Sequence, residues 1–150
     1  MEADDFDALF ARERRPMVRL AYLMLRSEAQ AEEVVQDAFV SVLERWDRVD
    51  NPGPYLRRCV INGCLSRRRR DARPVPVPVG GADAGLATDH TLDAVHRLAP
   101  RRRAMVVLRF YADLTQDEIA DALQVPVGTV KSGLHRALSE LKEALHDGVA

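Results

Sequence analysis

Residues 114–145, LTQDEIADALQVPVGTVKSGLHRALSELKEAL, predict two helices joined by a tight turn. Thr115 followed by Glu118 is a capping-box pattern, and it opens a short helix with the sequence QDEIADAL. The connection QVP at residues 124–126 is too short for more than a turn. It leads to a long helix from about Val127 to His146.

This long helix has two chemically different faces. Its apolar residues step by four, four, three and four, and they form one stripe: Val130, Leu134, Leu138, Leu141 and Leu145. Basic and hydroxyl groups lie opposite to the stripe or on its shoulder: Lys131, Ser132, His135, Arg136 and Ser139. A short helix, a tight turn and a longer helix with such a face are typical of a DNA-binding helix-turn-helix. The alternative is an ordinary solvated helix face.

Two shorter helices are predicted before this pair, over Asp93–Leu98 and Arg101–Ala112, so residues 91–150 are expected to form one small helical domain. The segment DARPVPVPVGGADAGLATDH, residues 71–90, alternates proline with valine and continues with glycines. This composition predicts a flexible linker. The alternative is a long surface loop, which is uncommon inside a compact domain.

Residues 1–70 are expected to form a second domain of three or four helices. Residues 4–26 read as an amphipathic helix, with a bend or interruption near Pro16. Ser27 and Gln30 form a capping-box pattern that begins the next helix. The apolar positions of that helix face one way: Val35, Ala38, Phe39, Val42, Leu43 and Trp46. Its other positions are acidic or polar and suit a basic protein surface better than DNA: Glu32, Glu33, Gln36, Asp37 and Glu44.

A third helix is predicted from about Tyr55 to Arg69, with Pro54 at its first position. Its inner stripe consists of small and aliphatic residues: Leu56, Cys59, Val60 and Cys64. One outer face is polar: Arg58, Asn62, Ser66 and Arg69. The helix ends in the basic run Arg67–Arg70, which could neutralise phosphates. The alternative is a solvated helix end, where cations also interact favourably with the helix dipole.

The charges are unevenly distributed along the chain. The formal net charge of the 150 residues is only −1, with 22 Lys and Arg against 23 Asp and Glu. Residues 1–50 carry 12 acids against 7 bases, whereas residues 51–73 carry 7 bases against 1 acid. Residues 100–150 carry 7 of each. Two basic elements joined by a long linker therefore indicate bipartite contact with DNA.

Other classes of protein have little support in the sequence. No apolar run approaches the roughly 20 residues of a membrane-spanning helix, and the acidic start lacks the basic region of a signal peptide, so we expect a cytoplasmic protein without membrane insertion. Cys59 and Cys64 match neither a disulfide framework nor a metal site and are expected to be buried free thiols. The histidines show no ligand spacing: His90, His96, His135 and His146. We therefore expect no enzyme activity, catalytic residues, metal or cofactor.

Three stretches resemble the extracytoplasmic-function (ECF) branch of the sigma-70 family of bacterial RNA polymerase sigma factors, and in particular its actinobacterial members. They are AEEVVQDAFVSVLERW at 31–46, PYLRRCVINGCLSRRRRD at 54–71, and the helix-turn-helix at 114–145. The run VPVGTVKS followed by LHRA is the most specific part. The resemblance implies an all-α protein of two small helical domains: sigma region 2 over 1–70 and sigma region 4 over 91–150, joined by a flexible Pro/Gly linker over 71–90.

The resemblance also implies a function and its partners. The chain would be a subunit that binds core RNA polymerase through the β′ and β subunits and directs it to the −10 and −35 elements of promoter DNA. The linker would thread toward the catalytic channel of the polymerase. Members of the family are often held by an anti-sigma factor, which is therefore a further candidate partner. The free protein is expected to be a monomer.

Residues matching the family's motifs are assigned to three sites. The first site binds the β′ helical clamp: Glu33, Gln36 and Asp37. The second, together with the turn at residues 50–53, holds the melted −10 strand: Tyr55, Arg58, Asn62, Arg67, Arg68 and Arg69. The third reads the −35 element: Thr129, Lys131, Ser132, His135 and Arg136.

Four positions depart from the family pattern. Gly133 replaces a common arginine, which suggests a lost DNA contact and a weaker helix. Gln124 stands where the turn usually has glycine, Ser66 replaces a frequent aspartate, and Gly63 interrupts the third helix. The main alternative function is a stand-alone helix-turn-helix transcriptional regulator, which would normally dimerise on a palindrome.

Overall fold

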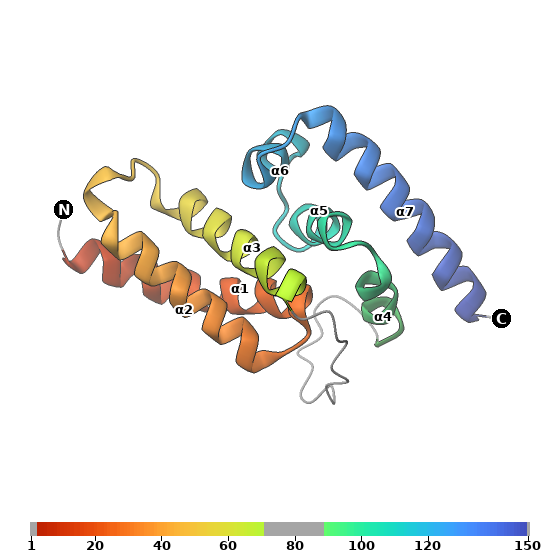
Figure 1. Ribbon diagram of the computed structural model, residues 1–150, viewed down its shortest axis with the longest axis horizontal. Coiled ribbons are helices and arrows are strands. Elements are labelled where there is room, and N and C mark those ends of the chain that lie inside the picture. The colour runs from red at the N-terminus through yellow and green to blue at the C-terminus, as the bar shows by residue number, and fades with distance from the viewer. Residues whose placement is uncertain (1–2, 71–88, 150) are drawn as a thin grey trace. The chain divides into compact units, whose positions relative to one another are not determined.

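The computed structural model describes the backbone of residues 3–70 and 89–149, and side chains within 5–67 and 90–146. Within these residues every regular element is helical, so the expected all-α class is confirmed. The chain divides into two compact units between residues 72 and 73 (Figure 1). The predicted linker over 71–90 lies outside the described residues, except that Asp89 and His90 already belong to a helix.

Unit 1 is a bundle of three α-helices (Figure 1). Its elements are α1 (Ala3–Leu25), α2 (Glu28–Glu44), the 3-10 helix η1 (Trp46–Arg48) and α3 (Pro52–Arg70). Each α-helix contacts the other two, and α2 lies against both α1 and α3. The core between them is almost entirely aliphatic and includes Leu20, Met24, Val34, Val42, Leu56, Val60 and Ile61.

Aromatic rings close one end of this bundle. Phe6 on α1 packs edge-on against Trp46, with ring centroids 5.5 Å apart, and against Phe39 at 6.1 Å. Phe10, one turn further along α1, lies 4.9 Å from the same Phe39 ring. These contacts connect α1, α2 and η1, and they fix the chain direction as it leaves α2.

Local signals predicted the start of α2 well and the course of α1 and α3 less well. Ser27 caps α2, because its hydroxyl accepts a hydrogen bond of 3.2 Å from the backbone N–H of Gln30. Of the bend or interruption expected near Pro16, the interruption is absent: α1 is one helix that continues through the proline, with buried residues such as Leu9 and Met17 on both sides. The first residue of α3 is Pro52 instead of Pro54, because the turn before it is shorter than expected.

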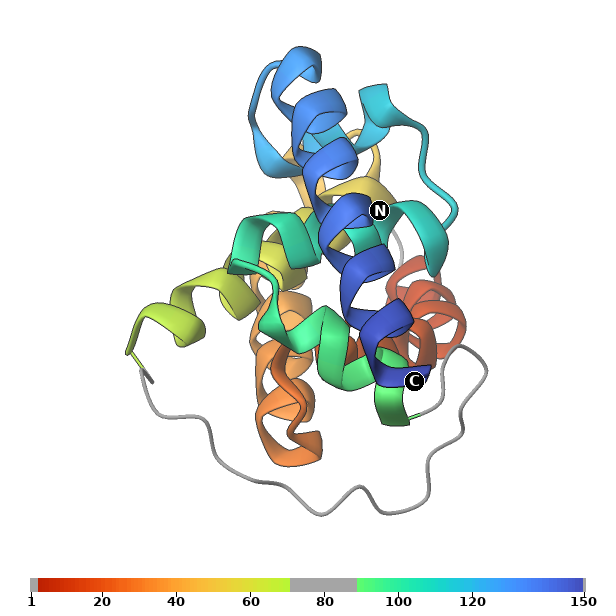
Figure 2. The same ribbon diagram turned by 90° about the vertical axis from the view of Figure 1, so that its right-hand side faces the viewer.

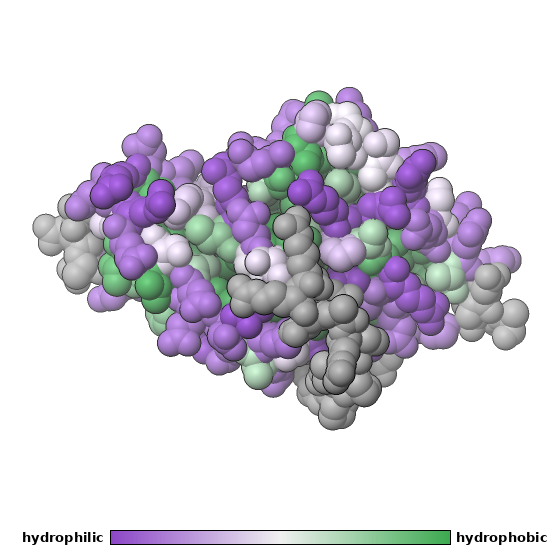
Figure 3. Space-filling view, viewed as in Figure 1, coloured by the Kyte–Doolittle hydropathy of each residue, from purple (hydrophilic) through white to green (hydrophobic). Residues whose placement is uncertain are grey.

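Unit 2 is built around its last helix. The elements are α4 (Asp89–Arg97), α5 (Pro100–Phe110), α6 (Gln116–Leu123) and α7 (Val127–Val149). Figure 2 shows α7 running along the three shorter helices, and it contacts all three. The predicted helices at 93–98 and 101–112 are therefore present, with shifted ends. The face visible in Figure 3 is mostly hydrophilic, as expected for helices that turn their apolar stripes inward.

Arg103 fixes the junction between α4 and α5. It is the one fully buried charged side chain among the described residues, at 1% exposure. Its guanidinium donates hydrogen bonds to the backbone carbonyls of His96 at 2.6 Å, Leu98 at 3.0 Å and Val95 at 3.3 Å. Val95 and His96 lie in the last turn of α4 and Leu98 follows the helix, and the Val95 carbonyl also accepts from the Leu98 N–H at 3.2 Å. A buried cation at this helix end bonds these carbonyls and favours the helix dipole.

Within the described part of the chain, no helix is long and apolar enough to cross a membrane. The same residues contain no group of three or more His, Cys, Asp or Glu side chains arranged to hold a metal ion.

Replacing Arg103 with methionine should destabilise unit 2. Arg103→Met keeps most of the side-chain volume but removes the buried donors to the His96 and Leu98 carbonyls, so we expect the free energy of unfolding to fall by about 3 kcal/mol. Urea denaturation of the full chain, followed by far-UV circular dichroism, measures this. Arg101→Met, two residues earlier and exposed, is the matched control and should change little. An unchanged midpoint for Arg103→Met would show that the hydrogen bonds contribute no net stability.

Candidate protein and nucleic-acid interfaces

The proposed −35 residues share one exposed face of α7. Thr129, Lys131, Ser132, His135 and Arg136 are all exposed within its first three turns. The residues between and directly after them are buried against the other helices of unit 2: Val130, Gly133, Leu134 and Ala137. Basic and hydroxyl groups therefore lie on the side of α7 that its own unit does not use. Donors of this kind can reach phosphates and base edges.

The helix α6 and the turn after it hold α7 in place. Thr115 and Glu118 form a complete capping box, with the Glu118 N–H donating to Thr115 Oγ1 at 3.1 Å and the Thr115 N–H to Glu118 Oε1 at 2.8 Å. Gln124 adopts the left-handed conformation, with φ 57° and ψ 49°, as expected from its place in the turn. Its side-chain Nε2 donates to the Asp121 carbonyl at 2.6 Å, which offsets part of the cost of a non-glycine residue there.

Gly133 lies on the buried side of α7 and does not belong to the reading face. A Cβ atom at this position would collide with the Met105 sulfur of α5 and approach its Cε to 3.0 Å. The departure from arginine at this position therefore removes nothing from the exposed face. It allows α5 and α7 to pack closely instead. Gly63 has a similar role in unit 1, where a Cβ would lie 2.9 Å from Val34 Cγ1, and α3 continues through it without interruption.

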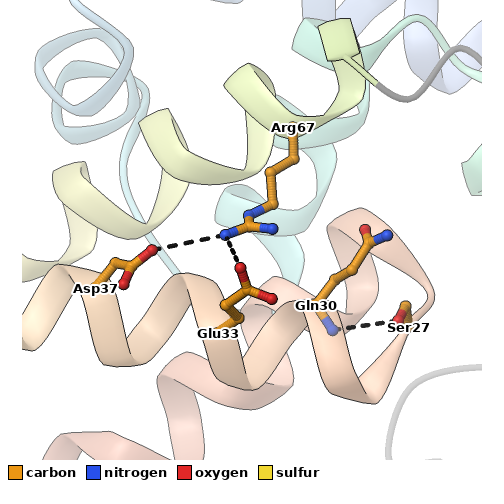
Figure 4. Close-up of polar contacts among 5 residues, drawn as sticks. All are labelled: Ser27, Gln30, Glu33, Asp37 and Arg67. Carbon is orange, nitrogen blue, oxygen red and sulfur yellow. Dashed lines mark hydrogen bonds and ion pairs between the residues drawn. The ribbon is translucent and has the colours of Figure 1, made fainter.

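The proposed polymerase-binding residues lie on the exposed face of α2. Glu33, Gln36 and Asp37 are exposed, while Val34 and Ala38 beside them are buried. The acidic groups on this face are held from both sides. Arg14 of α1 pairs with Glu32 at 3.3 Å. Arg67 of α3 pairs with Glu33 at 2.8 Å and with Asp37 at 3.6 Å (Figure 4).

The proposed −10 residues are spread along α3. Tyr55 and Arg58 are half-buried in its first two turns, and Asn62 is exposed one turn later. Arg67 is turned toward the acids of α2, so the structure brings it together with the first site and not with Asn62. The side chains of Arg68 and Arg69 lie outside the described residues.

The two cysteines differ in their surroundings. Cys64 is fully buried, as expected, and burial raises the pKa of its thiol to about 12. Cys59 is only half-buried, which corrects the expectation for this residue, because its position on α3 lies at the edge of the α2 contact. Partial burial raises the pKa of Cys59, and the neighbouring Tyr55 hydroxyl opposes that shift by hydrogen bonding to the sulfur.

The sequence matches two families over most of its length. Residues 9–74 match the family described as Sigma-70 region 2, and residues 91–141 match Sigma-70, region 4. The RNA polymerase sigma-E factor of Streptomyces avermitilis is 33% identical over 155 residues, which cover 96% of this chain and 87% of that protein. The chain belongs to the sigma-70 family. It is an RNA polymerase sigma factor, and the resemblance found in its motifs is confirmed.

Other relatives of this sigma factor place it in the ECF branch. The ECF RNA polymerase sigma factor SigM of Mycobacterium tuberculosis is 34% identical over 158 residues, covering 93% of this chain and 76% of that protein. Two solved structures share the fold. The sigma factor RpoE of Bartonella quintana, in complex with the anti-sigma factor NepR, has a TM-score of 0.83 at 21% identity, covering 96% of this chain and 98% of that one. CnrH, in complex with the cytosolic domain of CnrY, has a TM-score of 0.73 at 22% identity, covering 99% and 92%.

For two leucines of this sigma factor, the hydrophobic periodicity predicted burial, but the structure exposes them. Leu43, expected to face inward, is 55% exposed, and with Phe10 and Val40 it lines an apolar groove of about 380 Å³ between α1 and α2. Gln36, at the edge of the same groove, is four residues before Val40 and seven before Leu43, so helical spacing could have shown that the three share a face. Leu138 of α7 is also 43% exposed, because Gly133 and Ala137 take the centre of the buried stripe.

Replacing Gly133 with alanine should have opposite effects in two backgrounds. In the natural sequence the new Cβ meets the buried Met105, and overpacking of about 1–3 kcal/mol should outweigh the gain in helix propensity of about 1 kcal/mol. In a Met105→Ala background the space is open, and the same change should raise the free energy of unfolding. Urea denaturation of the four variants measures the coupling. The same sign in both backgrounds would contradict this packing.

The buried Cys64 thiol should make stability depend on pH in alkaline solution. Between its ordinary pKa of 9.0 and its folded value of about 12, the unfolded chain loses the thiol proton while the folded chain keeps it. The free energy of unfolding should therefore fall as pH rises in this window, by up to about 1.4 kcal/mol per pH unit. Urea unfolding of the full chain, followed by fluorescence of Trp46, measures the slope. Cys64→Ala should make the slope shallower, and an equal slope in both proteins would contradict the assignment.

Proposed function

We propose that this sigma factor binds core RNA polymerase through the exposed face of α2 and reads the −35 element through the exposed face of α7. One observation carries the proposal: in both units, the face that packing leaves exposed is the face that carries the family's functional motif. The α2 face is acidic, and the α7 face carries basic and hydroxyl groups. These two chemistries suit two different partners, a basic protein surface and DNA.

Glu33, Gln36 and Asp37 are the proposed contacts to the β′ clamp. Two carboxylates one turn apart, with an amide beside them, can accept several hydrogen bonds from lysine or arginine side chains. The β subunit is a second partner by family resemblance. An anti-sigma factor is a further candidate partner, because the two solved structures described above are complexes, and one is described as bound to an anti-sigma factor.

The start of α3 and the turn before it are the proposed place of the melted −10 strand. Tyr55 offers an aromatic ring and a hydroxyl group, and partial burial raises the pKa of that hydroxyl further above its ordinary value. Asn62 adds an exposed amide, and the arginines that follow Arg67 in the sequence supply charge. Stacking on an aromatic ring and charge neutralisation together hold single strands. A base that leaves the duplex costs a few kcal/mol of unstacking, which such contacts can offset.

The N-terminal turns of α7 are the proposed −35 reader. Arginine can bind a guanine edge in a bidentate way, while threonine, serine and lysine reach phosphates or bases.

We propose that the protein acts in the cytoplasm with the polymerase, as an initiation factor and not as an enzyme, with the linker passing toward the catalytic channel. We also propose that it is monomeric when free, with region 2 over 1–70 and region 4 over 91–150.

Run-off transcription with purified core RNA polymerase tests the proposed function. Promoter fragments selected from the source genome by the reconstituted holoenzyme serve as templates. We expect specific transcripts only when core polymerase and this protein are both present. Tight binding to a palindromic duplex without polymerase, together with no effect on initiation, would favour a stand-alone regulator instead.

Arg136→Ala should reduce transcription from promoters that depend on a −35 element. Losing one bidentate contact of about 1–2 kcal/mol lowers promoter affinity roughly tenfold. Because Arg136 is exposed, the thermal midpoint of the protein and its affinity for core polymerase should not change. Lys142→Ala, at an exposed position two turns further along α7, is the matched control. Equal transcription from Arg136→Ala and the natural protein would place the reading face elsewhere.

A further inference from the structure

Arg67 joins two helices that the family motifs assign to different partners. Its side chain leaves α3, and one guanidinium nitrogen, Nη2, lies 2.8 Å from Glu33 Oε1 and 3.6 Å from Asp37 Oδ2 (Figure 4). The first contact is a charge-assisted hydrogen bond, and the second is a longer ion pair. By its motif Arg67 belongs with the −10 residues. By its contacts it belongs with the acids of α2.

The exposed fractions of Arg67, Glu33 and Asp37 show which of these side chains is buried by their ion pairs. Arg67 is only 21% exposed, whereas Glu33 is 61% and Asp37 is 73% exposed. The arginine is therefore the half-buried partner, laid against α2, and both acids keep most of their surface toward solvent. A carboxylate has about four acceptor positions, so one contact to Arg67 leaves room for a basic partner.

We propose that Arg67 is a positioning residue for the polymerase-binding face and not a DNA contact. This inference rests on the proposed role of Glu33 and Asp37. Two carboxylates one turn apart on a helix repel each other and tend to turn away. A guanidinium that contacts both holds them toward the same side. From α1, Arg14 pairs with the neighbouring Glu32 alone, so Arg67 is the arginine that bridges the two acids proposed to bind polymerase.

Ordering these acids in advance should strengthen polymerase binding. Side chains that are already fixed lose less freedom when a partner arrives, and this effect is worth about a three- to tenfold change in affinity for one or two such residues. The same ion pairs prevent Arg67 from contacting DNA, since a side chain that lies along α2 does not extend toward a phosphate. Charge for the melted strand would then come from the other bases of α3.

The test compares affinity for core polymerase among variants of the full chain. Fluorescently labelled Arg67→Ala should bind core about three- to tenfold more weakly than the natural protein. Arg67→Lys, which keeps the charge but not the forked geometry, should recover part of the loss. Arg57→Ala, a half-buried arginine on the same helix outside the three sites, is the matched control. Circular dichroism melting checks that each variant folds.

A double-mutant comparison separates positioning from direct contact. In a Glu33→Gln, Asp37→Asn background, Arg67→Ala should have no further effect on core affinity, because there are no charges left to position. A further loss in that background would mean that Arg67 touches the polymerase itself, and it would overturn the inference. If the Gln/Asn variant binds core normally, the proposed site on α2 is itself wrong. If that variant is weak while Arg67→Ala is normal, only the role of Arg67 fails.

The dependence of promoter binding on salt provides the DNA readout. Holoenzyme is assembled at saturating core, and its affinity for a promoter is measured over a range of salt concentrations. A phosphate contact removed by Arg67→Ala would lower the logarithmic salt slope by about one. We expect the slope to stay unchanged. A decrease of about one, with normal core affinity, would make Arg67 a DNA contact and overturn the proposal.

Discussion

The packing of α2 between α1 and α3 is the constraint on which the first unit depends. A helix with a neighbour on each side must bury a wide stripe, and α2 does so with Val34, Val35, Ala38 and Val42. The helical repeat then leaves one side of α2 for solvent, and the acids Glu32, Glu33 and Asp37 lie there beside the exposed apolar residues Val40 and Leu43. This face is the one that the family motif assigns to polymerase. The fold of unit 1 and its proposed partner site are thus two consequences of one pattern.

In the second unit, too, packing against neighbouring helices determines which face of the main helix stays exposed. Its last helix contacts three short helices, and this requires a close approach at Gly133 and a sharp junction at Arg103. Both residues serve packing, and the opposite face of α7 stays open for basic and hydroxyl groups. The net charge of −1 conceals how the charges are distributed, because α2 carries only acidic charges, α3 carries only basic ones, and the bases near the start of α7 share its exposed face. A small net charge also favours weak binding to DNA by the free protein, which suits a subunit that polymerase carries to promoters.

Features set by neighbours in the sequence could be predicted, and features set by helix crossings could not. The caps at Ser27 and Thr115 and the turn at Gln124 follow from local chemistry, and the structure contains all three. The exposure of Leu43 and the burial of Gly133 depend on where another helix crosses, which periodicity does not specify. The contact of Arg67 with Glu33 joins residues 34 positions apart. From the sequence alone, an arginine in a basic run at a helix end could contact either a phosphate or an acid of a neighbouring helix. Only the three-dimensional contacts show that Arg67 pairs with the acids of α2.

Site-specific photo-crosslinking from α2 tests the central claim most directly. A photoreactive amino acid at Gln36, in the full chain incubated with core RNA polymerase, should crosslink to the β′ subunit. The same probe at Lys142 of α7 should give no β′ crosslink of comparable yield. If the Gln36 probe supports transcription yet does not crosslink to β′, polymerase binds another face, and the role assigned to the acidic face of α2 is wrong.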